Sequence, residues 1–212
     1  MARRRAPQPR NLLIRLMDEI RARQPEFRQD SLGTSFLKKL YMTKQQRLRL
    51  LRWMSYILSC LAALLIQDDI LSRIPIWGAC IDLTAAVILL ITVIEGTESG
   101  SVFVLLASTV YYFTGSAPGP YVVAAMTIFG IGATLFRQLF WHRSRSAILL
   151  CACIALMLYE VATFGGAIFM KLTRWDRIGN FLLSGLYGCA VMIPLYPLMH
   201  KFGSIGGHTW KE

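Results

Sequence analysis

The chain has 212 residues, a formal net charge of +11 and 55% hydrophobic residues. Residues 1–52 carry 14 of its 23 Lys and Arg residues, and the remainder is dominated by long apolar runs. A water-soluble core does not need apolar runs of this length, whereas a lipid bilayer does, so the composition argues against a soluble fold. The chain is expected to be an integral membrane protein with a basic cytosolic segment at its start.

The basic residues define an N-terminal extension, residues 1–46. Apolar residues recur at helical spacing from Asn11 to Arg23, which predicts a helix lying on the membrane surface. A solvated tail with transient helicity would also explain the pattern. Anionic lipids are the partner that this charge favours, and nucleic acid is not expected because the segment lacks interleaved aromatic residues. No cleavable signal peptide is expected, because the first apolar run follows roughly fifty polar and basic residues.

Six apolar segments follow within a membrane domain, residues 47–202, and a short cytosolic tail, residues 203–212, ends the chain. This pattern predicts an all-α integral membrane protein built as a bundle of six transmembrane helices. Arg49 and Arg52 are expected to reach the cytosolic headgroups from the start of the first span. The expected spans are Leu50–Ile66, Trp77–Ile94, Ser101–Thr114, Tyr121–Phe136, Ser146–Met170 and Ile178–Met199.

The distribution of basic residues predicts the orientation of these spans. Six spans place both termini on one side of the membrane. With the N-terminus in the cytosol, the inner segments, counted together with Arg52 at the start of the first span, hold 19 Lys and Arg residues and the outer segments hold four. Cytoplasmic segments are enriched in Lys and Arg, so both termini are expected to be cytoplasmic.

The turn after the second span is the most informative polar segment. Gly96 and Gly100 are four residues apart, as the close approach of two packed helices requires. A simple cytosolic turn would also use Gly and Ser here. Glu95 and Glu98 lie beside a leaflet that is itself negative, so a protein partner or the basic extension is expected to compensate them.

Two further carboxylates lie within the expected spans. Asp82, near the outer end of the second span, is interpreted either as a polar contact that holds spans one and two or a periplasmic partner, or as a helix-start residue favoured by the helix dipole. Glu160 lies midway along the fifth span, where a charged carboxylate is costly. It is expected to face the bundle interior, near Tyr159 and Thr163, and a packing role is favoured over a proton relay.

No catalytic, cofactor-binding or metal site is expected, and the chain is not expected to be an enzyme. The histidines lack ligand spacing and no hydrolase or phosphate-binding motif is present. The cysteines are interpreted as small apolar residues, since none has the spacing of a metal or redox pair. These five residues are Cys60, Cys80, Cys151, Cys153 and Cys189.

A series of short motifs follows the spans in order. Ile66-Gln67 ends the first span, Ile81-Asp82-Leu83 opens the second, Glu95-Gly96 and Gly100 follow it, and Tyr196-Pro197 lies near the end of the sixth. In this order the chain resembles the bacterial rod shape-determining protein MreD family. It departs from that family in having no proline before Asp82. It also has Ser108 to Tyr112 where many members carry an acidic residue.

The resemblance implies a bundle similar to the substrate-binding subunits of energy-coupling-factor vitamin transporters. It also implies a non-catalytic scaffold in the bacterial inner membrane that helps to regulate cell shape and peptidoglycan synthesis. The implied partner is an MreC-like single-span protein and, through it, an MreB-like filament and the RodA–transpeptidase complex. Spans one to three are the expected docking face. Gln67, Asp82, Glu95, Gly96, Gly100 and Glu160 are the candidate partner or helix-packing residues. The alternative function is that of the vitamin-binding transporter subunit itself.

Overall fold

The computed structural model describes residues 44–73, 79–115, 117, 119–140 and 145–205 of the chain. The chain divides into two units, Met1–Thr43 and Lys44–Glu212, and the fold described below is that of the second. Most of the basic extension, including its expected surface helix, and the last residues of the tail lie outside the described residues.

The described residues form six α-helices and two short 3₁₀ helices. Each expected apolar span corresponds to one α-helix, with ends that differ by a few residues. The 3₁₀ helices are η1 (Leu71–Arg73) and η2 (Trp175–Arg177). The α-helices are α3 (Lys44–Asp69), α4 (Leu83–Glu95), α5 (Thr97–Phe113), α6 (Tyr121–Phe140), α7 (Arg145–Phe169) and α8 (Ile178–Gly203).

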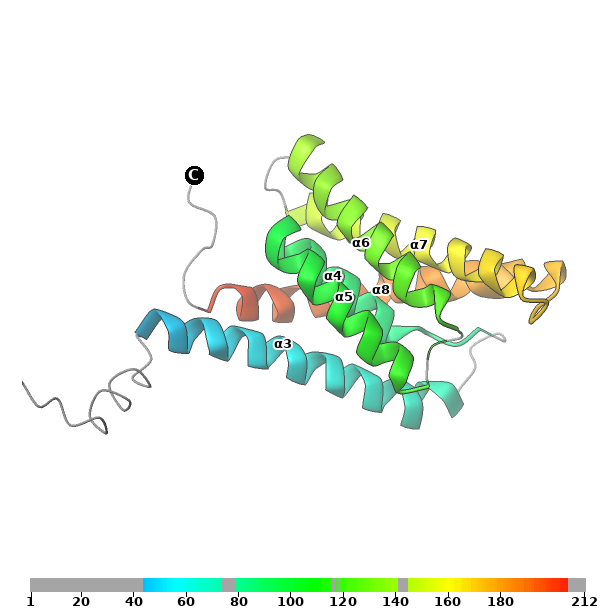
Figure 1. The fold of residues 1–212 in the computed structure, drawn as a ribbon, viewed down its shortest axis with the longest axis horizontal. Coiled ribbons are helices and arrows are strands. Elements are labelled where there is room, and N and C mark those ends of the chain that lie inside the picture. The colour runs from blue at the N-terminus through cyan, green and yellow to red at the C-terminus, as the bar shows by residue number, and fades with distance from the viewer. Residues whose placement is uncertain (1–43, 74–78, 116, 118, 141–144, 206–212) are drawn as a thin grey trace, which may run out of the picture. The chain divides into compact units, whose positions relative to one another are not determined.

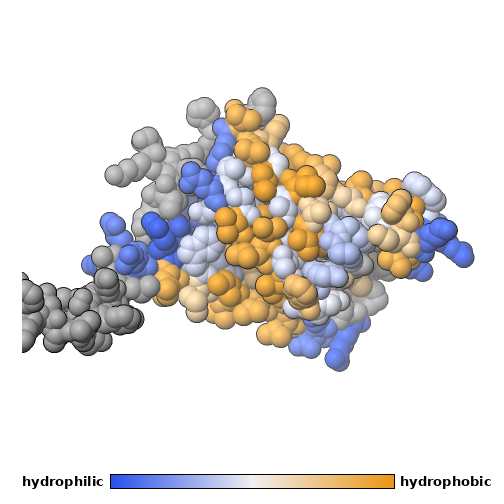
Figure 2. Space-filling model, viewed as in Figure 1, coloured by the Kyte–Doolittle hydropathy of each residue, from blue (hydrophilic) through white to orange (hydrophobic). Residues whose placement is uncertain are grey.

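Four of the helices are long and apolar enough to cross a membrane, as in a multi-pass membrane protein: α3, α6, α7 and α8. Their outward side chains include large apolar residues that a soluble protein would bury, such as Leu58, 69% exposed, and Ile128, 65% exposed. Figure 2 shows such apolar side chains over much of the visible face, with hydrophilic side chains gathered mainly toward the ends of the helices.

Helix α4 differs from its expected span because it begins at Leu83 and not at Trp77. Its 13 residues rise about 20 Å, whereas the hydrocarbon core of a bilayer is about 30 Å thick. The Asp82 side chain caps its first turn, and Ala79 to Asp82 are not helical. Gly96, with a φ of 87°, ends it. The periodicity of the apolar residues did not reveal this start, because apolar residues continue on both sides of Asp82.

The other helices surround α4, which packs against α3, α5, α6, α7 and α8 (Figure 1). Around it, α5, α6, α7, α8 and α3 follow one another, each packed against the next. Nearly every residue of α4 is buried, as expected for a helix that is apolar on all sides. The core of the described bundle is therefore a short helix enclosed by longer ones.

The contact between α4 and α5 depends on Gly100. A Cβ atom at this position would lie 2.5 Å from the backbone oxygen of Thr92 on α4. We expect Gly100→Ala to push the two helices apart and to lower the free energy of unfolding by about 1–3 kcal/mol. The measurement is the loss of helical circular dichroism as SDS is titrated into detergent micelles that contain the protein.

Gly132→Ala on α6 is the matched control, because a Cβ atom at Gly132 would have no atom within 4 Å. This change should leave stability unchanged or raise it, since alanine favours the helix over glycine. Equal destabilisation by both substitutions would contradict the close contact assigned to Gly100.

Candidate functional site

Two clusters of polar side chains lie at the two ends of α4. A helix leaves N–H groups at its start and C=O groups at its end without partners inside the helix. Longer helices expose these groups near the membrane surface. Because α4 is short and enclosed, other parts of the protein have to satisfy them.

At the start of α4, Asp82 connects three helices. Its Oδ1 accepts a hydrogen bond from the Ala85 backbone N–H at 2.9 Å, which is the usual geometry of an N-terminal cap. Its Oδ2 accepts hydrogen bonds from the hydroxyls of Tyr111 on α5, at 3.0 Å, and Tyr159 on α7, at 3.2 Å. Asp82 is therefore a helix-start residue, as one interpretation had it, and the helices that its side chain joins to α4 are α5 and α7, which correspond to spans three and five and not to span one.

Gln67, near the end of α3, completes this N-terminal cluster. Its Oε1 accepts a hydrogen bond from the Thr84 backbone N–H at 2.8 Å, and its Nε2 donates to the Tyr111 hydroxyl at 3.3 Å. One amide thus satisfies a second N–H group of the first turn of α4 and also orients the tyrosine that binds Asp82. Through Gln67, Asp82, Tyr111 and Tyr159, side chains of α3, α5 and α7 meet at the start of α4.

At the other end of α4, backbone carbonyls find partners from outside the helix. The Gly96 N–H donates to the Thr92 carbonyl at 3.1 Å, and the Arg137 guanidinium on α6 donates to the Val93 carbonyl. A cation at this position also offsets the negative end of the helix dipole. Arg137 therefore links α6 to the end of α4.

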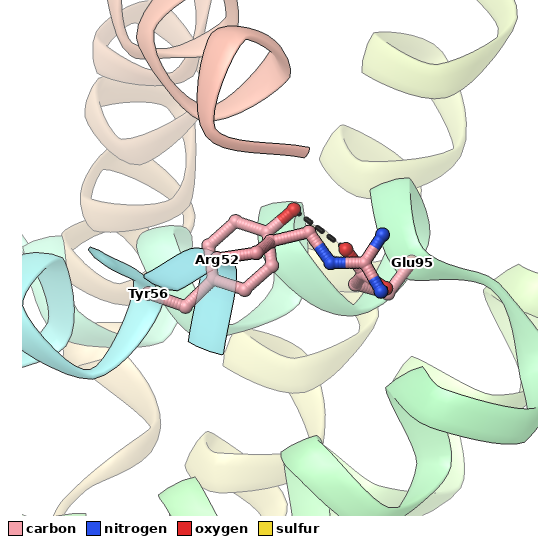
Figure 3. Close-up of polar contacts among 3 residues, drawn as sticks. All are labelled: Arg52, Tyr56 and Glu95. Carbon is pink, nitrogen blue, oxygen red and sulfur yellow. Dashed lines mark hydrogen bonds and ion pairs between the residues drawn. The ribbon is translucent and has the colours of Figure 1, made fainter. Parts of the chain in front are cut away.

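Glu95, the last residue of α4, is buried with two residues of α3 (Figure 3). Its Oε1 accepts a hydrogen bond from the Tyr56 hydroxyl at 2.7 Å, and its Oε2 lies 3.5 Å from Nη2 of Arg52. All three residues are less than 7% exposed. The aromatic rings of Trp53 and Tyr56 also pack against Phe103 of α5, with centroids about 6 Å apart.

The cation that compensates Glu95 is thus Arg52, which lies in the same bundle. The expectation that Arg52 reaches the lipid headgroups was wrong, because its side chain is only 4% exposed and faces α4. Arg49, by contrast, is exposed. Arg52 lies one helical turn before Tyr56, so both side chains are on the face of α3 that meets Glu95.

Glu160 lies on the face of α7 that meets α8. It is 4% exposed, and its Oε1 accepts a hydrogen bond from the Ser184 hydroxyl at 2.9 Å. The helices approach closely here, since a Cβ atom at Gly185 would lie 3.3 Å from Cγ of Glu160. The donor comes from α8 and not from the neighbouring Tyr159, whose hydroxyl binds Asp82.

The structure therefore divides the six candidate residues among three places. Gln67 and Asp82 meet at the start of α4, and Glu95, Gly96 and Gly100 lie at its end or at the adjoining turn. Glu160 belongs to the α7–α8 contact.

Sequence reasoning missed the partners Arg52, Tyr56, Tyr111 and Ser184, and it did not foresee that the Tyr159 hydroxyl binds Asp82. A tyrosine inside an apolar span was the available signal, because a buried tyrosine hydroxyl usually finds a hydrogen-bond partner.

Most polar atoms of these clusters bind one another, although Nε of Arg52, Oε2 of Glu95 and the Thr84 hydroxyl are buried without a hydrogen-bond partner among the described residues. In the described residues, no group of three or more His, Cys, Asp or Glu side chains has an arrangement that could hold a metal ion. The donors and acceptors around Asp82 bind one another, and Glu95 binds Tyr56 and Arg52. What the arrangement does is to fix the positions of α3, α5, α6 and α7 relative to α4.

Comparison of the chain with protein families, with curated proteins and with solved structures finds no match. The class of protein that the fold of the described residues defines is a helical membrane protein in which polar side chains satisfy both ends of a short buried helix.

Removing only one partner of the Arg52–Glu95 pair should lower the stability of the protein. We expect Arg52→Met to lower the free energy of unfolding by about 3–5 kcal/mol, because it leaves a buried carboxylate without its cation. The double variant Arg52→Met, Glu95→Leu should lose less than the single one. Arg49→Met is the control on an exposed arginine of the same helix and should change nothing. Stability is measured by SDS titration. If the loss in the double variant equals the sum of the losses in the two single variants, Arg52 and Glu95 are not coupled.

Asp82→Ala should remove the cap of α4 and leave two tyrosine hydroxyls without their acceptor. The expected loss in the free energy of unfolding is about 2–4 kcal/mol. Asp176→Ala, at an exposed position in η2, is the control and should be silent. Protection of the α4 backbone amides from hydrogen exchange is a second measurement, and it should fall first at Ala85, whose N–H loses its acceptor. Unchanged protection of the Ala85 amide would rule out the capping role.

Proposed function

We propose that this protein is a non-catalytic scaffold of the MreD type, which helps to organise peptidoglycan synthesis during bacterial cell elongation. In this proposal it is a bundle of six membrane-spanning segments in the inner membrane, with both termini in the cytoplasm. It binds an MreC-like single-span protein, which links it to an MreB-like filament and to a RodA–transpeptidase complex. The basic N-terminal extension binds anionic lipids.

One observation carries the proposal. Three of the short motifs on which the resemblance depends lie at α4: two of them bound this helix in the sequence, and Gln67 of the third reaches its first turn from α3. Gln67 and Asp82 satisfy the N–H groups of its first turn, Gly96 ends it, and Gly100 allows α5 to pack against it. A protein that acts by presenting a fixed surface needs residues of this kind, because they hold helices in place.

The acidic residue expected near the end of the third span has a structural replacement. Tyr111 occupies this part of α5, donates to Asp82 and accepts from Gln67. A carboxylate at Tyr111 would lie beside Asp82 and would repel it if both were ionised. The tyrosine supplies a neutral donor in its place, so the departure from the family pattern is compatible with the proposed role.

The second candidate is a vitamin-binding transporter subunit, and the N-terminal cluster is the observation that favours it. Such a subunit needs polar and aromatic side chains near the outer end of the bundle, and Asp82, Tyr111 and Tyr159 are of this kind. Their hydrogen bonds are made to one another, however, and a ligand would have to displace them. The scaffold therefore explains the arrangement with fewer changes.

The experiment is depletion of the protein from a rod-shaped bacterium that encodes it. The scaffold predicts that cells become wide and round and that fluorescent D-amino acids no longer enter the side wall. Complementation with the Asp176→Ala variant should restore rods, whereas the Asp82→Ala variant should fail. Depleted cells that remain rods and lose uptake of a labelled vitamin would refute the scaffold and support the transporter subunit.

A further inference from the structure

Helix α8 contains two prolines, Pro194 and Pro197. Proline has no backbone N–H, so each one removes the hydrogen bond that would join it to the carbonyl four residues earlier. The two carbonyls concerned are those of Ala190 and Ile193. Among the described side chains, none donates a hydrogen bond to either carbonyl. These two acceptors therefore lack the partner that an uninterrupted helix would give them.

The position of these carbonyls makes the loss costly. Ala190 and Ile193 lie in the middle third of α8, a helix long and apolar enough to span a membrane. Both residues and both prolines are exposed, and Ile193 is 63% exposed. A backbone carbonyl without a partner in the hydrocarbon region is strongly unfavourable, and lipid tails offer no donor. As far as the described residues show, this face of α8 therefore lacks donors for the two carbonyls in a bilayer.

A second copy of the chain does not complete this face. A symmetric contact would place the same surface on both sides. The exposed stripe of α8 carries Leu182, Leu186, Ala190, Ile193 and Pro197 at its centre, and none of these side chains is a hydrogen-bond donor. Acceptors would meet acceptors, so the occupant has to bring a different chemistry.

We infer that this face of α8 is the docking site for a transmembrane helix of another protein, which donates a hydrogen bond from a polar side chain at mid-membrane depth to the Ala190 or Ile193 carbonyl. The complementarity is one of partial charge, with two electronegative acceptors facing a donor. Ala190 is small, so the partner helix can approach closely. The inference rests on the proposed scaffold function and specifies how its single-span partner binds, on α8 and not on spans one to three.

The test uses the full chain in vesicles of phosphatidylcholine and phosphatidylglycerol. The probe is a tryptophan-free helix of about 20 leucine and alanine residues, carrying one central asparagine and a coumarin acceptor. Energy transfer from the tryptophans of the chain reports association, at lipid dilutions where the peptide does not self-associate. The asparagine peptide should bind roughly three- to tenfold more tightly than the same peptide without asparagine.

The double variant Pro194→Ala, Pro197→Ala restores both N–H groups and should abolish this preference without loss of stability. Pro120→Ala is the matched control, because Pro120 is exposed but precedes α6 and frees no carbonyl within a helix. Ala190→Phe leaves the carbonyls free but blocks close approach, and it should also abolish the preference.

Equal binding of the two peptides to the unaltered chain would overturn the inference, because lipid alone would then cover the face. Energy transfer between labelled copies of the chain that disappears in the double proline variant would also overturn it, in favour of self-association. The vesicles contain no cell-elongation protein, so neither of these results tests the scaffold proposal. The depletion experiment, which measures cell shape, tests it separately. If cells lose their rod shape on depletion but the two peptides bind equally well, the protein is a scaffold that docks its partner on another face.

Discussion

The structure depends on one constraint, which is that a helix too short to reach the membrane surfaces must have both of its ends satisfied inside the protein. Helix α4 rises about 20 Å, and its neighbours cover it on all sides. At its start Asp82 and Gln67 accept hydrogen bonds from backbone N–H groups, and at its end Gly96 and Arg137 donate to backbone carbonyls. Each of these contacts brings in a different part of the chain.

The same constraint explains why polar residues lie inside the bundle while apolar residues face outward. Arg52 and Glu95 neutralise each other beside the end of α4, and Tyr56, Tyr111 and Tyr159 place apolar rings in the core while their hydroxyls bind carboxylates. Such polar contacts in a medium of low polarity give a unique arrangement of helices, since any shift leaves groups unpaired. The prolines of α8 create the opposite situation, because on this helix two backbone carbonyls lose their usual N–H donors and no described side chain replaces them.

Much of the fold could be predicted from the sequence, because apolar length is a property of the chain itself. All six expected segments correspond to helices, and the expected start of the fourth, at Tyr121, is the observed one. The start of α4 could not be predicted, because hydropathy does not distinguish a residue that caps a helix from one that continues it. The sequence also showed that Asp82, Glu95 and Glu160 are unusual, because a carboxylate within an apolar span costs free energy unless it has a partner.

The sequence by itself determined which segments are helical and which polar residues needed partners, because both follow from the cost of exposing polar groups to an apolar medium. Only the tertiary structure decided which side chains are the hydrogen-bond and ion-pair partners of these polar residues. Arg52 faces the bundle interior and pairs with Glu95. The hydroxyl of Ser184 donates to Glu160, whereas that of Tyr159 donates to Asp82. The pairings depend on the rotation and register of each helix against its neighbours. Close contacts, such as that of Gly100 with Thr92, set this rotation and register. The periodicity of the sequence does not reveal which residues make such contacts.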